Sequence, residues 1–102
     1  CMFVFEDILT LDDVAIQRIL RDVETKELAL ALKGASEEVA NVIYKNQSKR
    51  AAASLKEDIE YLGPVRLTDV EKAQQQIVAV IRRLEDAQEI IISRGGEDAL
   101  IM

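Results

Sequence analysis

The chain of 102 residues contains no histidine and a single cysteine, Cys1. Zinc sites built from cysteine and histidine are therefore excluded in practice, as are the catalytic dyads and triads that need histidine. A lone cysteine cannot close a disulfide within the chain, which fits a reducing compartment. We therefore expect no metal, no cofactor and no catalytic residue, and hence a protein that is not an enzyme.

Long apolar runs and excess positive charge are missing as well. No segment approaches the ~20 apolar residues that a membrane span needs, and no secretory signal is visible. The formal net charge is −6, whereas surfaces that bind nucleic acid or anionic lipid are basic. We expect no nucleic-acid partner and no direct membrane insertion. Because the chain does not begin with Met, we expect it to be a fragment of a longer protein.

Aromatic residues are scarce, with two Phe, two Tyr and no Trp, yet 49% of the residues are hydrophobic. A core of Leu, Ile, Val and Ala is therefore predicted, in a single domain spanning residues 1–102. Helical periodicity predicts an all-α compact bundle of about six helices, with short helices packed around one long C-terminal helix. Short helices joined by short loops favour an armadillo-like, right-handed superhelical packing. We expect residues from about 94 to 102 to form a flexible tail.

Capping residues predict where several helices begin and end. Asp, Ser and Thr are typical N-caps, and Gly is typical of C-terminal stops. The last of the predicted starts opens the longest helix, which should run to about residue 87. The starts are predicted at Asp12-Asp13, at Ser36 followed by Glu37-Glu38, and at Thr68, which could form a capping box with Glu71; the stops are predicted at Gly34 and at Gly63-Pro64.

The helix predicted between residues 48 and 62 has one apolar face and one charged face. With about 100° per residue, Ala52, Ile59 and Leu62 fall within about 60° of Leu55, which predicts a buried stripe. Lys56 has a possible partner in Glu60, four residues on. The opposite face and its edge carry Arg50, Ser54, Glu57, Asp58 and Tyr61.

Three charges of this helix, Arg50, Glu57 and Asp58, have no opposite charge at the spacing that permits a pair within the helix. They are free to pair with another part of the fold, with water or with another protein. From the residues alone, a plain solvated face is the favoured interpretation. A general base at Glu57 or Asp58 would need a concave pocket and a shifted pKa, which nothing in the sequence indicates.

The other acidic pairs are better explained as first-turn residues than as ligands. Adjacent residues on a helix point about 100° apart, so neighbouring carboxylates do not converge on one ion. Acids in the first turn instead complement the helix dipole. The "RGG" stretch near residue 95 lacks the Lys-Ser/Thr of a phosphate-binding loop.

The stretches MFVFEDI, LALALKGAS, NQSKRAAASLKEDIEYLGPVRLTDVEKAQQQIVAVIRRLE and the acidic, glycine-containing tail together resemble the C-terminal domain of the bacterial flagellar motor switch protein FliG. The resemblance covers essentially all 102 residues. It implies a non-enzymatic rotor component, located at the cytoplasmic face of the inner membrane, that generates torque and takes part in switching the direction of rotation. It implies as partners the cytoplasmic loop of the stator protein MotA, FliM and neighbouring FliG subunits.

The resemblance also implies roles for individual residues. The stator-interacting charges would be Lys33, Arg50, Glu57, Asp58 and Arg66, and residues 1–5 would hold a hinge motif formed by Met2, Phe3, Val4 and Phe5. The family varies between Asp and Glu at the first acid of the adjacent pair, and Glu57 keeps its charge. Phe3 and Phe5 could equally anchor the first helix in the core. A structural helical adaptor that binds a neighbouring protein through apolar surface is the alternative function.

Overall fold

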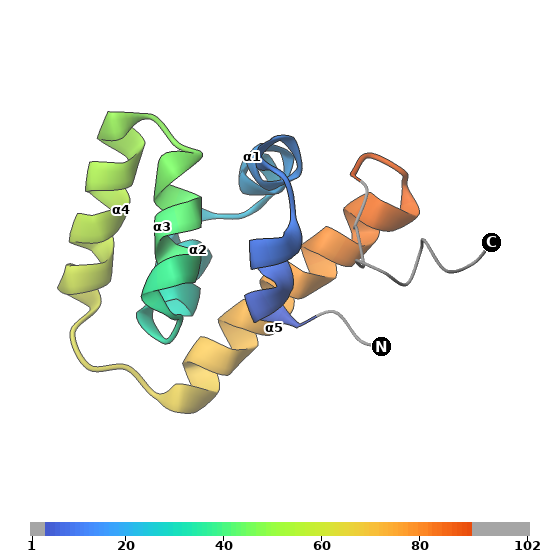
Figure 1. Cartoon of the computed structure of the whole chain (residues 1–102). Helices are drawn as coiled ribbons and strands as arrows, with labels where there is room; N and C mark the ends of the chain where they lie inside the picture. The colour runs from blue at the N-terminus through green and yellow to red at the C-terminus, as the bar shows by residue number, and fades with distance from the viewer. Residues whose placement is uncertain (1–3, 91–102) are drawn as a thin grey trace.

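The structure is a computed structural model that describes residues 4–90. Within them lie one short 3-10 helix and five α-helices and no strand (Figure 1), so the all-α prediction is confirmed. The predicted tail from about residue 94 lies outside the described residues. The elements are η1 (Phe5–Thr10), α1 (Asp13–Asp22), α2 (Thr25–Lys33), α3 (Glu37–Lys45), α4 (Lys49–Leu62) and α5 (Leu67–Asp86).

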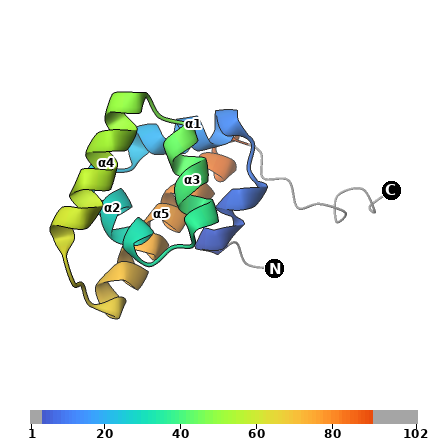
Figure 2. The same ribbon diagram turned by 60° about the vertical axis from the view of Figure 1, so that its left-hand side comes forward.

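The short helices pack around α5, as predicted, but not all of them touch it to the same extent. Helix α2 makes the most extensive contact with α5 and also packs against α4, while α1 and η1 contact α5 further along. Helix α3 packs between η1 and α4. In both views α4 lies at the outer edge of the molecule, with α2 between it and α5 (Figures 1 and 2).

The core is aliphatic, and every buried residue of the described part is hydrophobic. Along α5 the apolar residues that recur every three or four positions form a buried stripe, with at most 1% of Ile77 and Ile81 exposed; its members are Val70, Ala73, Ile77, Ile81 and Leu84. Val80, which follows the same periodicity, is only partly buried. Val14, which follows the periodicity of α1, is 75% exposed. Periodicity therefore predicts which face of a helix is apolar, whereas the burial of each residue on that face depends on how far the neighbouring helices extend over it.

Two predicted N-caps are confirmed and one is wrong. The side chains of Asp12 and Ser36 accept hydrogen bonds from backbone N–H groups three residues on. Thr68, in contrast, lies inside α5, because the extended backbone already ends at Arg66 (φ −81°, ψ 141°). The carbonyl of Arg66 accepts from the N–H groups of Asp69 and Val70, both at 3.1 Å. The predicted capping box between residues 68 and 71 therefore does not form.

The apolar face of α4 is less buried than predicted. Leu55 is 1% exposed, but Ala52, Ile59 and Leu62 are only partly buried, because α4 is covered by α2 and α3 on one side alone. Lys56 also differs from the expectation: its Nζ lies 4.8 Å from the centroid of the Tyr44 ring on α3. Partial burial raises the pKa of Tyr44.

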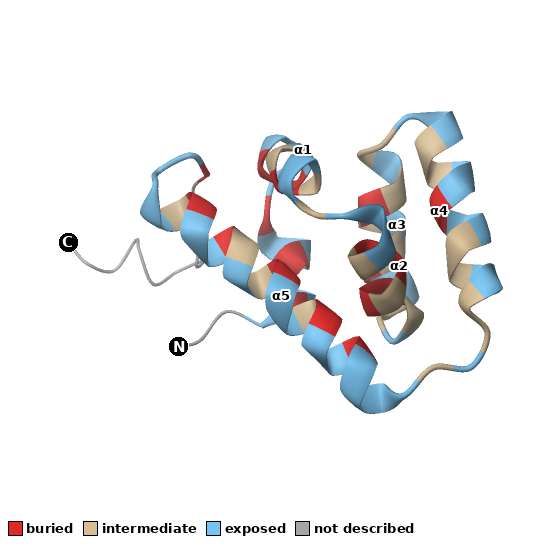
Figure 3. Ribbon diagram, turned by 180° about the vertical axis from the view of Figure 1, so that it is seen from behind, coloured by how far each residue is buried: buried red, intermediate tan, exposed pale blue. Residues whose placement is uncertain are grey.

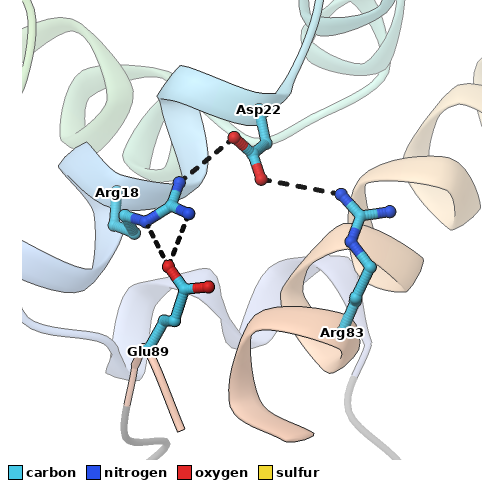
Figure 4. A network of polar contacts seen from close by, with 4 residues as sticks. All are labelled: Arg18, Asp22, Arg83 and Glu89. Carbon is cyan, nitrogen blue, oxygen red and sulfur yellow. Dashed lines mark hydrogen bonds and ion pairs between the residues drawn. The ribbon is translucent and has the colours of Figure 1, made fainter. Parts of the chain in front are cut away.

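The end of α5 is fixed against α1 by a turn and a polar network. Gln88 adopts a left-handed conformation (φ 63°), and the N–H of Glu89 donates to the carbonyl of Leu84 at 2.8 Å, which is the pattern of a Schellman motif. Glu89 accepts from Nε of Arg18 on α1 at 2.9 Å. The same arginine pairs with Asp22, which also lies 3.6 Å from Arg83 of α5 (Figure 4). These acceptors raise the pKa of Arg18, the hydrogen bond to Glu89 most.

Candidate functional site: the charged face of α4

Helix α4 is defined at both ends by local chemistry. Ser48 is its N-cap, and the Ser48 hydroxyl accepts a hydrogen bond from the N–H of Ala51 at 3.1 Å. At the other end Gly63 has φ 62° and ψ −152°, a region that is essentially restricted to glycine. Pro64 follows and cannot continue the hydrogen-bonding ladder. The predicted stop at Gly63-Pro64 is therefore confirmed, and it makes α4 a short, rigid element.

The charges of α4 point away from the core. Arg50 and Glu57 are exposed and Asp58 is half-buried. Seven residues are close to two helical turns, so Arg50 and Glu57 lie on one line about 10 Å apart along the axis. None of the three side chains has an ion pair or a side-chain hydrogen bond with any other residue between 4 and 90. Figure 3 shows that the outer side of α4 is largely exposed.

The order of charges along α4 opposes its helix dipole. Lys49 and Arg50 occupy the first turn, which holds no acid, and the last turn holds no base. The acids Glu57, Asp58 and Glu60 lie in the C-terminal half. A helix favours the reverse order, each well-placed charge contributing about 0.3–1 kcal/mol at an exposed site. Helix α3 has that favourable order. The charges of α4 are therefore not explained by a contribution to stability.

Lys33, unlike the three charged side chains of α4, has a hydrogen-bond partner within the fold. Its Nζ donates to the carbonyl of Ile59 at 3.3 Å, and its side chain is half-buried. That carbonyl is in the last turn of α4, where backbone acceptors lack intrahelical partners. A cation there also complements the negative end of the dipole. Lys33 of α2 thus supplies the positive charge that the end of α4 lacks in its own sequence, and it fastens α4 to α2.

Arg66, like Arg50, is a cation at the N-terminal end of a helix. It is the N-cap of α5, is exposed, and its side chain makes no capping hydrogen bond. The residues from Gly63 to Val65 join α4 to α5, so Arg66 lies beyond the C-terminal end of α4 (Figure 1). Both arginines therefore stand where the helix dipole disfavours a cation.

A shallow hollow of about 310 Å³ adjoins the acidic end of α4. Asp58, Tyr61 and Leu62 line one side, while Thr25, Lys26 and Ala29 of α2 line the other. Tyr61 is 95% exposed. The sequence placed Tyr61 on the charged face but gave no reason to include Lys26, because only the packing of α2 on α4 brings Lys26 there.

The described half of the predicted hinge motif divides between surface and core. Val4 is 50% exposed and Phe5 only 5%, so Phe5 lies in the core, in agreement with the alternative in which it anchors the first helix there. The N–H of Val4 donates to the carboxylate of Asp7 at 2.9 Å, which fixes the entry into η1. Met2 and Phe3 lie outside the described residues.

Within residues 4–90 no group of three or more Asp, Glu or Cys side chains is arranged to hold a metal ion. No helix in that range is both long enough and apolar enough to span a membrane. The fold and the exposed charges define a class: an all-helical domain in which one outer helix, α4, carries charges of both signs that have no partner among residues 4–90.

Comparison with known proteins gives the family. The family model described as the FliG C-terminal domain matches residues 1–92, and the chain belongs to that family. It is 66% identical over 101 residues to the flagellar motor switch protein FliG of Thermotoga maritima and 56% identical to that of Bacillus subtilis. In both cases the match covers 99% of the chain and 30% of the relative, so the chain spans under a third of these relatives.

Two solved structures of FliG have the same fold as this chain. A FliG fragment of Helicobacter pylori, residues 116–343, superposes with a TM-score of 0.86 at 38% identity, covering 87% of this chain and 39% of the fragment. Full-length FliG of Aquifex aeolicus gives a TM-score of 0.81 at 46% identity, covering 82% of this chain and 26% of that one.

Proposed function

We propose that this domain is a non-enzymatic rotor component of the bacterial flagellar motor switch complex, in which it transmits force through protein contact. Its membership of the FliG C-terminal domain family supports this role, as do relatives named flagellar motor switch proteins. In this role the domain works at the cytoplasmic face of the inner membrane, within a ring that includes FliM and neighbouring copies of the full-length protein. It contributes to torque and to the reversal of rotation.

The charged face of α4 is the part that contacts the cytoplasmic loop of the stator protein MotA. The observation that carries this assignment is the order of its charges, which opposes the helix dipole while Arg50, Glu57 and Asp58 lack partners among the described residues. Exposed ion pairs contribute only ~0–1 kcal/mol each, which suits contacts that form and break as a rotor steps. Charges of both signs give orientation and rate more than affinity.

The remaining predicted charges act at the two ends of this face. Lys33 holds the C-terminal end of α4 through the Ile59 carbonyl and so orients the acids. Arg66 extends the face beyond Gly63-Pro64. Val4 and Phe5, with residues 2 and 3, form the hinge on which the domain reorients during switching. The burial of Phe5 and the exposure of Val4 give such a hinge one fixed side and one free side.

A charge-reversal experiment in the full-length protein tests the stator contact. Arg50→Glu should impair swimming, and a compensating reversal of an acid in the stator loop should restore part of it, because like charges no longer meet. Arg21→Glu is the location control, since Arg21 is exposed and its helix α1 lies apart from α4, on the other side of α3 (Figure 1). If no double reversal across the candidate loop positions improves on the worse single variant, direct charge pairing is wrong.

The alternative function, an adaptor that holds a neighbouring protein through apolar surface, is favoured by one observation. A groove between Val4, Phe5 and α5 has an apolar middle formed with Val78 and Ala79. An adaptor of this kind should tolerate reversal of Arg50 and fail when Val78 is replaced by Asp. The two variants therefore separate the two functions in one motility assay.

A further inference from the structure

The groove along α5 lies outside the charged face of α4 and has a volume of about 830 Å³. Pockets that bind ligands occupy about 300–1,000 Å³, so the groove is large enough for a peptide segment. One wall is Val4 with Phe5, at the entry to η1, and the other is the side of α5 between Glu71 and Asp86. In Figure 1 the chain enters η1 beside α5.

The chemistry of the groove changes along its length. Its middle is apolar, with Val4, Val78 and Ala79, and Val4 is 50% exposed. Toward the C-terminal end of α5 it is lined by Arg82, Arg83 and Asp86, so that this end carries two cations and one carboxylate. No carboxylate between residues 4 and 90 pairs with Arg82, and Arg83 makes one contact, 3.6 Å from Asp22, with its side chain still 65% exposed. A matching occupant would combine adjacent acidic and apolar residues.

Residues 91–102 of the same chain have that composition. Glu97 and Asp98 are followed by four apolar residues, Ala-Leu-Ile-Met. Ile90 is buried and Glu89 is bonded to the end of α5, so the chain leaves the described part near the basic end of the groove. The α5 lining from Glu71 to Asp86 spans about 22 Å, and twelve residues reach up to about 40 Å.

We propose that residues 97–102 bind in this groove of their own chain. Glu97 and Asp98 pair with Arg82 and Arg83, while the apolar residues 99–102 cover Val4, Val78 and Ala79. The binding is intramolecular, and short tethers give effective concentrations on the order of millimolar, so weak contacts suffice. The bound segment ties Val4 to α5. A role for that tie in switching rests on the proposed function, whereas the docking itself does not.

Paramagnetic relaxation measured by NMR on the whole 102-residue chain tests the docking. A nitroxide is attached to Ala99→Cys in a Cys1→Ser background, and relaxation enhancement is compared at the amides of Gln75 and Glu57. We expect enhancement at Gln75 at least several-fold larger than at Glu57, because docking holds residue 99 beside the middle of α5, whereas an unbound tail would visit it only briefly. Equal or absent enhancement at the two amides would overturn the proposal.

A charge variant and a mixing experiment complete the test. Arg82→Glu should remove the enhancement at Gln75, and Arg21→Glu, outside the groove, should leave it unchanged; an Arg82→Glu variant that keeps the enhancement refutes the pairing. In a mixture of isotope-labelled chain without nitroxide and unlabelled chain with it, no enhancement should occur. Enhancement there would mean that the groove takes the segment of a second copy, which contradicts intramolecular binding. None of these measurements requires the stator.

Discussion

Replacing Arg50 by Glu should stabilise the isolated domain while it weakens the proposed stator contact. Arg50 is the second residue of α4, in a first turn that contains two cations and no acid. Reversing this charge replaces an unfavourable interaction with the helix dipole by a favourable one, with no ion pair lost among residues 4–90. Losing one unfavourable and gaining one favourable interaction of about 0.3–1 kcal/mol each at low ionic strength gives an expected gain of about 0.6–2 kcal/mol. For a domain of this size that gain raises Tm by roughly 2–16 °C.

Urea denaturation followed by circular dichroism measures the gain, at low salt and again at high salt. Salt should reduce it, because the dipole interaction is screened. Arg21→Glu is the matched control: Arg21 is the basic residue in the last turn of α1, so the same substitution at the opposite end of a helix should lower stability by a similar amount. A measurable loss of stability in Arg50→Glu would refute the reasoning, because the helix dipole favours an acid over a base at this end, and Arg50 would then make a stabilising contact within the fold.

Four further substitutions test the packing and the backbone, each by the same denaturation assay. Leu55→Ala should cost about 2–5 kcal/mol, since Leu55 is fully buried; a loss below about 0.5 kcal/mol would contradict the assigned inward face of α4. Gly34→Ala places a Cβ 2.7 Å from Cγ1 of buried Val70 and should cost about 1–3 kcal/mol, and truncating Val70 to Ala should reduce that cost if the clash is its cause. Gly63→Ala meets no atom within 4 Å but is strained at φ 62°, so a loss of about 1–3 kcal/mol should persist whatever the neighbours. Gln88→Gly should stabilise by about 0.5–1 kcal/mol by relieving a left-handed conformation, and a loss would mean that the Gln88 side chain makes a contact of its own.

The parts of the fold that depend on neighbours in the sequence could be predicted. Asp12 and Ser36 cap helices, and Gly63 ends one, because each interaction closes within three or four residues. The start of α5 could not be predicted in this way. Thr68 offers a sound local cap, yet α5 begins at Leu67 with Arg66 as its N-cap. Val70 therefore lies in the first turn of α5, where it is buried beside Gly34 of α2, a contact that no local pattern encodes.

In the candidate site, too, some features follow from the local sequence pattern and others depend on the packing of distant helices. Periodicity placed Arg50, Glu57 and Asp58 on or beside one exposed face, and the structure agrees. The bond from Lys33 to the Ile59 carbonyl and the position of Lys26 beside Asp58 depend on α2 packing against α4, which no local pattern encodes. The sequence does carry one local signal for this face, namely the order of charges along α4 relative to its dipole.

Three contacts stabilise α4 although the order of its charges opposes the helix dipole. The Ser48 hydroxyl, the buried Leu55 and the Lys33 ammonium stabilise the helix at its N-cap, its inner face and its C-terminal carbonyls, respectively. All three contacts lie at the ends or on the inner side, so none of them depends on Arg50 or Glu57. The exposed charges can therefore take whatever order a partner requires, at a cost of about 0.3–1 kcal/mol each. The outer face of α4 therefore carries a small electrostatic cost that a role in protein contact explains and a role in stability does not.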